Sequence, residues 1–278
     1  MAKSTVKISE AWRKKWRPAG VPVLLYHGIT GIGTPPIPAG ENKFWITKLQ
    51  FVDQMERIRA GGYEVGPSLS ELCRLPETAV QAPQLALTFD DGHATDYTDV
   101  FPVLCEYGFR ADFFINTATV GSAGYLTWNQ IGEMHGAGMS FQSHSHHHVD
   151  LSLMPPARLH GQLGYSKLLI EDRLGAPVEF LSVPYGLINK RVFTAARKEG
   201  YRAVCTSRNW PAQPCHTQIA RVCIHSHTDS REFEGLLARD FSPYAVRTVR
   251  EALLYLPKQI LLRLKPNRLA AQAAGGVR

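Results

Sequence analysis

Short apolar runs alternate with longer stretches of mixed polarity along most of this chain. The runs are rich in β-branched and aromatic residues, and they predict strands at 21–27, 84–90, 110–116, 139–144, 179–185, 201–207 and 220–226. Continuous apolar character is typical of strands that are buried on both faces of a parallel sheet.

The segments between these runs have the pattern of amphipathic helices. Thr127 and Gln130 have the spacing of a capping box at a helix start, and Gly175 and Gly200 follow helical stretches as C-terminal caps do. Seven strands that alternate with helices in one continuous domain predict an α/β fold, closed or nearly closed into a barrel. In such barrels the chemistry gathers at the carboxyl ends of the strands.

The net charge of +7 is spread unevenly over the 278 residues. Residues 1–17 hold six Lys/Arg and one acid, residues 247–278 hold seven and one, and the body between them is slightly acidic. An acidic body argues against a nucleic-acid-binding surface. We therefore expect a basic N-terminal extension (1–19), a barrel (20–241), and a basic amphipathic C-terminal helix with a tail (242–278).

The C-terminal segment carries an apolar stripe at intervals of three and four residues. Its members are Val246, Val249, Leu253, Leu256, Ile260 and Leu264, with basic residues around them. Two interpretations stay open: a helix that packs on the barrel, and a helix that lies on an anionic membrane surface.

Nothing in the chain has the length or pattern of a membrane span or a secretion signal. The longest apolar runs are short, the N-terminus is basic and polar, and the five cysteines are scattered without CxxC pairs. The expectation is a cytoplasmic protein, with peripheral contact to the inner face of the membrane through the C-terminal helix as an additional hypothesis.

Polar side chains gather where the predicted strands end. Asp90 and Asp91 follow an apolar strand and precede Gly92, whose bend can bring both carboxylates to the barrel mouth. Burying two carboxylates is costly without a cation or hydrogen bonds, so one is expected to bind a metal and the other to act as a base. The alternative is a helix N-cap or a simple loop pair.

Four of the eleven histidines lie in the run "SHSHHH" after the fourth strand. His144 and His148 have the i, i+4 spacing that places two imidazoles near one ion on a helical turn. Two histidines and one aspartate suit zinc with a position left for water. A solvated polar loop is the alternative, and His146 and His147 are the weaker ligand candidates.

Other strand ends add candidates for substrate contact. Tyr26 and His27 follow the first strand, Pro184 and Tyr185 the fifth, and His225 the seventh. Aromatic faces for sugar rings are the remaining candidates, and the chain offers Trp128 and Trp210 for them, although core packing is the alternative for both.

The motifs "TFDDG", "SHSHHH" with its H-S-x-x-H core, and "PYG" occur in this order. Together with "LLYHGI" they resemble the polysaccharide deacetylase family, the NodB homology domain of carbohydrate esterase family four, over roughly residues 20 to 230. The resemblance implies a single-domain, distorted (β/α)7 TIM-like barrel. It also implies metal-dependent hydrolysis of an N-acetyl group on an amino sugar.

Residue by residue, the resemblance implies Asp90 as general base and Asp91, His144 and His148 as metal ligands. The backbone N–H of Tyr185 matches the position that holds the oxyanion. Two positions depart from the family: Ser182 stands where an Arg usually steadies the base, and "RVCIH" only approximates the motif whose His, here His225, is the general acid.

The implied cofactor is a divalent metal, with Zn²⁺ favoured and Co²⁺, Ni²⁺ or Mn²⁺ as alternatives. The expected substrate is an N-acetylated oligo- or polysaccharide, and the basic ends suggest a lipid-linked biosynthetic intermediate. Two other functions stay open: a catalytically silent carbohydrate-binding scaffold of glycan assembly, which the absence of Arg at position 182 favours, and a hydrolase of another C–N bond.

Overall fold

The computed structural model describes residues 17–31, 37, 41–66, 68–74, 83–213 and 216–264. The predictions for most of the N-terminal extension and for the tail beyond Leu264 lie outside these residues. All seven predicted strands are present among them, which confirms the parallel α/β barrel.

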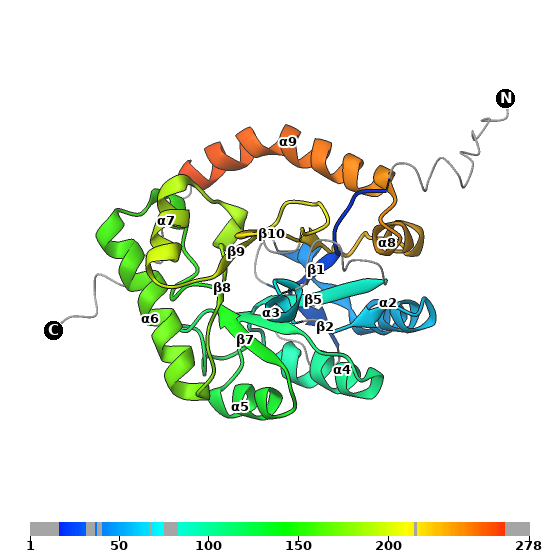
Figure 1. Cartoon of the computed structure of the whole chain (residues 1–278), viewed down its shortest axis with the longest axis horizontal. Coiled ribbons are helices and arrows are strands. Elements are labelled where there is room, and N and C mark those ends of the chain that lie inside the picture. Colours follow the sequence, from blue (N-terminus) through cyan, green and yellow to red (C-terminus); the bar gives the residue numbers. More distant parts are fainter. Residues whose placement is uncertain are drawn as a thin grey trace.

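The barrel strands pair in parallel around a nearly closed ring (Figure 1). Six of them follow the predicted runs: β1 (Val23–Tyr26), β5 (Gln84–Asp91), β6 (Asp112–Ile115), β7 (Ser140–Ser143), β8 (Phe180–Ser182) and β9 (Ala203–Thr206). The short strands β2 (Ile29–Thr30), β3 (Ile46–Thr47) and β4 (Glu64–Val65) lie off this ring.

The seventh predicted strand is divided in two at Arg221. Its first part, β10 (Gln218–Ala220), pairs with β9, and its second part, β11 (Val222–Cys223), pairs with β1. The segment therefore links the last strand of the sheet to the first. The side chain of Arg221 at the division is fully buried.

Helices surround the strands, as Figure 1 shows. They are α2 (Lys48–Ala60), α4 (Phe101–Tyr107), α5 (Trp128–Gly136), α6 (Pro156–Leu174), α7 (Lys190–Lys198), α8 (Ser230–Leu237) and α9 (Phe241–Leu264), with the single turn α3 (Leu69–Leu72). Thr127 and Gln130 form the predicted capping box of α5, and Gly175 ends α6 in the left-handed conformation. Hence local sequence determines several helix ends.

Side chains alternate along each strand between an inner layer, inside the barrel, and an outer layer, between the strands and the helices. Tyr26, Phe89, Phe113 and Phe141 stand opposite one another in the register of β1, β5, β6 and β7, and their rings stack in a ladder with centroids 4.9–5.4 Å apart. Tyr26 also contacts Phe51 of α2 and is 1% exposed. The prediction that Tyr26 contacts substrate is therefore wrong, because its ring belongs to the core between strands and helices.

Candidate active site

The carboxyl end of β5 places two adjacent aspartates at the barrel mouth. Asp90 is 3% exposed and alternates with Phe89 of the outer ladder. Asp91 has a φ of 79°, and Gly92 follows with a φ of 69°. A Cβ at Gly92 would lie 2.9 Å from Cγ2 of Ile115 on β6. The bend therefore starts at Asp91 itself and needs glycine next to it.

The carboxylate of Asp90 forms a bidentate ion pair with Arg221. Arg221 donates from its two terminal nitrogens to Oδ1 at 2.7 Å and to Oδ2 at 2.8 Å. Ser182 at the end of β8 donates from Oγ to Oδ2 at 2.8 Å, and it accepts a bond of 2.6 Å from Arg221. The three side chains thus form one buried network from three strand segments.

Burial raises the pKa of Asp90, but the Arg221 guanidinium and the nearby His144 outweigh this effect, and the net pKa lies below its ordinary value. The carboxylate is therefore ionised at neutral pH. An ionised, oriented carboxylate at a barrel mouth has the properties of a general base.

Three potential metal ligands come together beside this network. Oδ1 of Asp91 lies 3.4 Å from Nε2 of His144 and 3.3 Å from Nε2 of His148. One ligand atom from each of the three residues lies within 4.8 Å of the others. Nε2 of His144 is also 3.9 Å from Oδ2 of Asp90, so the two carboxylates flank the same imidazole.

A loop, and not a helical turn, brings the two histidines together. His144 directly follows β7, and Ser145 and His148 adopt left-handed φ values of 67° and 47°. Nδ1 of His144 lies 2.9 Å from the carbonyl oxygen of Ser182 and donates to it, which leaves the lone pair of Nε2 facing Asp91. A hydrogen bond of this kind fixes the tautomer that a metal-binding imidazole needs.

The pKa values of the three ligand candidates shift in different directions, although the three side chains share one environment. Burial lowers the pKa of His144, but Asp90 and Asp91 outweigh it and the net shift is upward. Burial lowers the pKa of His148 to about 4, despite the opposing charge of Asp91. Burial raises the pKa of Asp91, yet His148 and the other imidazoles hold it well below its usual range.

The remaining histidines of the run face α6 instead. His146 lies 2.7 Å from the hydroxyl of Thr117 and packs edge-on against Tyr165. His147 contacts the amide of Gln162 through both its backbone N–H and its ring. The run therefore divides into one pair at the carboxylates and one pair at the helix.

The turn after β8 forms another part of the mouth. Pro184 is buried, while Tyr185 is 39% exposed and has a φ of 61°. The Tyr185 ring contacts the ring of His148, and its hydroxyl donates to the His148 carbonyl at 3.3 Å. Asp91, His148 and Tyr185 are thus all non-glycine residues with positive φ, and such strain is typical of functional sites.

His27 and His225, the histidines at the ends of the first and seventh predicted strands, have different surroundings. Burial lowers the pKa of His27, and Asp91 and Asp90 are the charges that act on it most strongly. His225 stacks on His227, and burial together with Arg247 lowers its pKa to about 3. Both rings contact Phe44, so Phe44 lies between His225 and the His27 side of the mouth.

The two tryptophans predicted to contact sugar rings are half-buried and pack against neighbouring elements. Trp128 begins α5, packs on the core and lies under the guanidinium of Arg173. Trp210 packs against Phe241 and Tyr244 of α9. Both rings therefore pack between elements of the fold.

Sequence reasoning missed Arg221. The residue interrupts the apolar run "QIARVCIH", and a charge inside a buried strand needs a partner. The motif resemblance implies a base-steadying Arg at the position of Ser182, and here Ser182 and Arg221 hydrogen-bond to each other and to Asp90. Arg221, from the seventh predicted strand, thus supplies the cation, and the small side chain of Ser182 leaves space for its guanidinium.

The fold and the site define a class: a (β/α) barrel with a candidate divalent-metal centre beside a buried carboxylate. Comparisons with known proteins agree. The family described as polysaccharide deacetylase matches residues 78–204. A peptidoglycan-N-acetylglucosamine deacetylase of Bacillus cereus is 31% identical over 178 residues, 63% of this chain and 80% of that protein. A chitooligosaccharide deacetylase of Sinorhizobium fredii is 29% identical over 150 residues, 52% of this chain and 65% of that protein.

A solved structure is similar over a larger share of the chain. The deacetylase PplD of Streptococcus pyogenes, in complex with acetate, superposes with a TM-score of 0.71 at 26% identity, over 80% of this chain and 99% of that one. The chain belongs to the polysaccharide deacetylase family. Its enzyme class is that of carbohydrate N-deacetylases, which hydrolyse C–N bonds other than peptide bonds.

Proposed function

We propose that the barrel mouth removes the acetyl group from an N-acetylated amino sugar in an oligo- or polysaccharide. One observation supports this most strongly: an ionised carboxylate held by Arg221 lies beside a group of one carboxylate and two imidazoles. The named relatives act on N-acetylated glycans, which makes such a glycan the substrate class to test first.

Asp91, His144 and His148 would hold a divalent metal, and zinc is our choice because two imidazoles and one carboxylate suit it. The residues present fit such an ion, since the hydrogen bond from Nδ1 of His144 to Ser182 leaves Nε2 available. A bound divalent ion supplies Lewis acidity, which lowers the pKa of water and polarises an acetamide carbonyl.

Asp90 would take the proton of the attacking water. Arg221 and Ser182 hold its carboxylate in one orientation, so the base is already positioned before substrate arrives. The backbone N–H of Tyr185 would donate to the oxygen of the tetrahedral intermediate. The left-handed turn at Tyr185 supports this role, because it sets the direction of the peptide next to His148.

His27 is our revised choice for the acid that protonates the departing amine, in place of His225. His27 follows Tyr26, whose register partner is Phe89, so it stands beside Asp90 at the end of β1 and β5. Burial lowers the pKa of both imidazoles, but Asp91 and Asp90 oppose this for His27, whereas Arg247 and His227 lower the pKa of His225 further. Replacing each with Gln tests the choice: we expect His27→Gln to lower acetate release more than His225→Gln. The reverse order would restore His225.

A silent carbohydrate-binding scaffold loses its main argument. It depended on the absence of the Arg that steadies the base, and Arg221 supplies this cation. The base, its cation and the metal ligands are all present together, which favours turnover.

Acetate release tests the proposed function. Wild type with zinc or cobalt is assayed on N-acetylated chito-oligosaccharides beside Asp90→Asn and the exposed control Asp172→Asn. We expect activity in wild type and in the control, and loss of activity in Asp90→Asn. Equal activity in all three would remove Asp90 as base, and metal binding without activity on any glycan would favour the scaffold.

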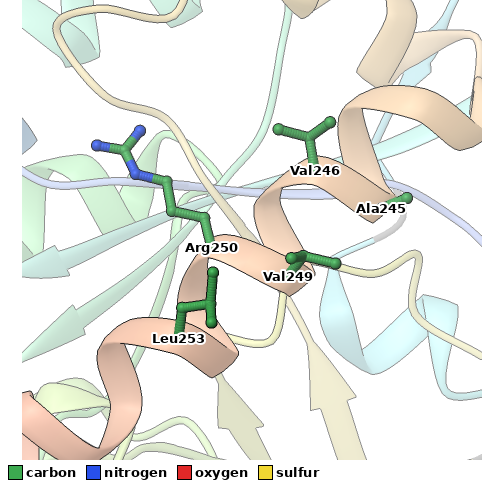
Figure 2. Close-up of a pocket in the computed structure, with 5 residues that line it drawn as sticks. All are labelled: Ala245, Val246, Val249, Arg250 and Leu253. Atoms are coloured by element: carbon green, nitrogen blue, oxygen red, sulfur yellow. The ribbon is translucent and has the colours of Figure 1, made fainter.

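We also propose that α9 lies on an anionic membrane surface. Val246, Val249 and Leu253 are 63%, 59% and 74% exposed, and Figure 2 shows them along one helix with Arg250 beside them. The barrel side of α9 is provided by Tyr244 and Arg247, which are buried. The six Lys/Arg that follow Arg247 in residues 250–278 add the charge that attracts anionic lipid. No helix among the described residues is long and apolar enough to cross a membrane.

Vesicle co-sedimentation tests this surface. A Val246→Ser/Val249→Ser/Leu253→Ser variant should bind phosphatidylglycerol vesicles less than wild type does, because it removes the apolar contact. Leu168→Ser, at an equally exposed leucine on α6, is the matched control and should not differ from wild type. Equal binding by all three proteins would contradict the proposal.

A further inference from the structure

His93 is a buried imidazole immediately beyond the metal-ligand candidates. It follows Asp91 by two residues and is 4% exposed. Its Nε2 lies 3.6 Å from Oδ2 of Asp91. Within the described part of the chain this buried nitrogen has no partner at normal hydrogen-bond distance. Burying a polar atom without a hydrogen-bond partner costs free energy, so the burial of Nε2 of His93 beside Asp91 suggests a role for this nitrogen.

Two aromatic rings and the backbone hold the imidazole in this direction. Trp45 lies 4.6 Å from the His93 ring on one side, and Tyr125 stacks at 5.4 Å with an interplanar angle of 23°. His93 also forms an isolated β-bridge with Tyr125. Because ring and backbone are both held, a small movement of the Asp91 carboxylate suffices to close the gap to Nε2.

The two carboxylate oxygens of Asp91 make their closest contacts with different imidazoles. Oδ1 faces Nε2 of His144 and of His148, at 3.4 and 3.3 Å. Oδ2 makes the closest approach to His93, at 3.6 Å. The carboxylate therefore has one oxygen for an ion and one oxygen for a donor.

We propose that His93 is a positioning residue for the metal centre. Its Nε2–H donates to Oδ2 of Asp91 and holds Oδ1 toward His144 and His148, so that the carboxylate binds through one oxygen. The inference rests on the proposed metal site. Donors that orient a ligating side chain typically contribute about 10- to 100-fold to metal affinity.

Zinc affinity of the metal-free protein tests the role without any assay of activity. Competition with a chromophoric chelator compares wild type, His93→Phe, His93→Gln and the exposed control His216→Phe. Phe keeps a ring between Trp45 and Tyr125 but has no donor, whereas Gln restores an N–H. We expect affinity to fall about 10- to 100-fold in His93→Phe, to return most of the way in His93→Gln, and to stay unchanged in His216→Phe.

The unfolding midpoint of each metal-free protein accompanies these measurements. A loss of affinity in His93→Phe at an unchanged midpoint, with recovery in His93→Gln, supports positioning. Affinity within twofold of wild type in His93→Phe overturns it, as does an equal loss in His93→Gln. His144→Ala separates the two levels: if it too leaves zinc affinity unchanged, the proposed metal site itself fails, whereas a loss in His144→Ala alone rejects only the role of His93.

Discussion

Asp90 and Asp91 are neighbours in sequence, yet they lie in opposite chemical surroundings. Asp90 belongs to the barrel interior, where a guanidinium and a hydroxyl occupy both of its oxygens. Asp91 turns out of the strand into a group of imidazoles. Both carboxylates have a lowered pKa, but the cause is a permanent cation for the first and titratable rings for the second. One bend thus gives two identical groups different chemistry.

Removing the cation should have the largest effect on stability. Arg221→Met leaves the buried charge of Asp90 unpaired, which we expect to cost about 3–5 kcal/mol in the free energy of unfolding. Urea denaturation measures this cost. Lys48→Met is the control, because its pair with Asp99 is partly exposed and should contribute no more than about 1 kcal/mol. Similar losses in the two variants would contradict the special role of the buried pair.

A third buried carboxylate, that of Asp112, has a backbone donor in place of a cation. Asp112 accepts the N–H of Leu69 at 2.9 Å, and burial raises its pKa to about 6. The folded protein then holds the proton more tightly than the unfolded chain does. Stability should therefore fall as pH rises from about 4 to about 6, by up to about 3 kcal/mol from this group.

Asp112→Asn keeps the acceptor oxygen and removes the ionisation. We expect the difference in unfolding free energy between variant and wild type to shift in favour of the variant across this pH window, and to be constant above it. Urea titrations at pH 4, 5, 6 and 7 measure the difference. A difference that does not change with pH would show that Asp112 titrates normally.

The hydroxyl of Ser182 should have the smallest effect. Ser182→Ala removes one bond to Asp90 and one to Arg221 but leaves the ion pair intact. We expect a loss of about 1–2 kcal/mol in stability, typical of a buried hydrogen bond. Calorimetry beside Arg221→Met checks the order, and a larger loss for Ser182→Ala would reverse the importance of the two donors.

The strands could be predicted because buried parallel strands are apolar without interruption, and their observed bounds differ from the predicted ones by only a few residues. Because these strands are apolar on both faces, the sequence does not indicate whether a given side chain points into the barrel or out toward the helices. Tyr26 could not be assigned to the outer ladder from sequence, since a strand buried on both faces shows no alternation of polarity.

The approach of Asp91 to His144 and His148 was predicted, but the local structure was not. The i, i+4 spacing suggested a helical turn, and a loop with two left-handed residues makes the contact instead. Arg221 was missed for a different reason. It meets Asp90 across 131 positions only because the barrel closes, and sequence alone does not reveal which strand end a buried cation faces.

The contrast between the two aspartates is tested most directly by replacing each with Asn and measuring zinc content and acetate release in the same preparations. We predict that Asp91→Asn loses bound zinc and activity together. Asp90→Asn should keep zinc near the wild-type level while acetate release falls by about 10²- to 10⁴-fold, as expected for loss of a general base. Equal zinc loss in both variants, or full activity in Asp90→Asn, would contradict the division of labour between the two carboxylates.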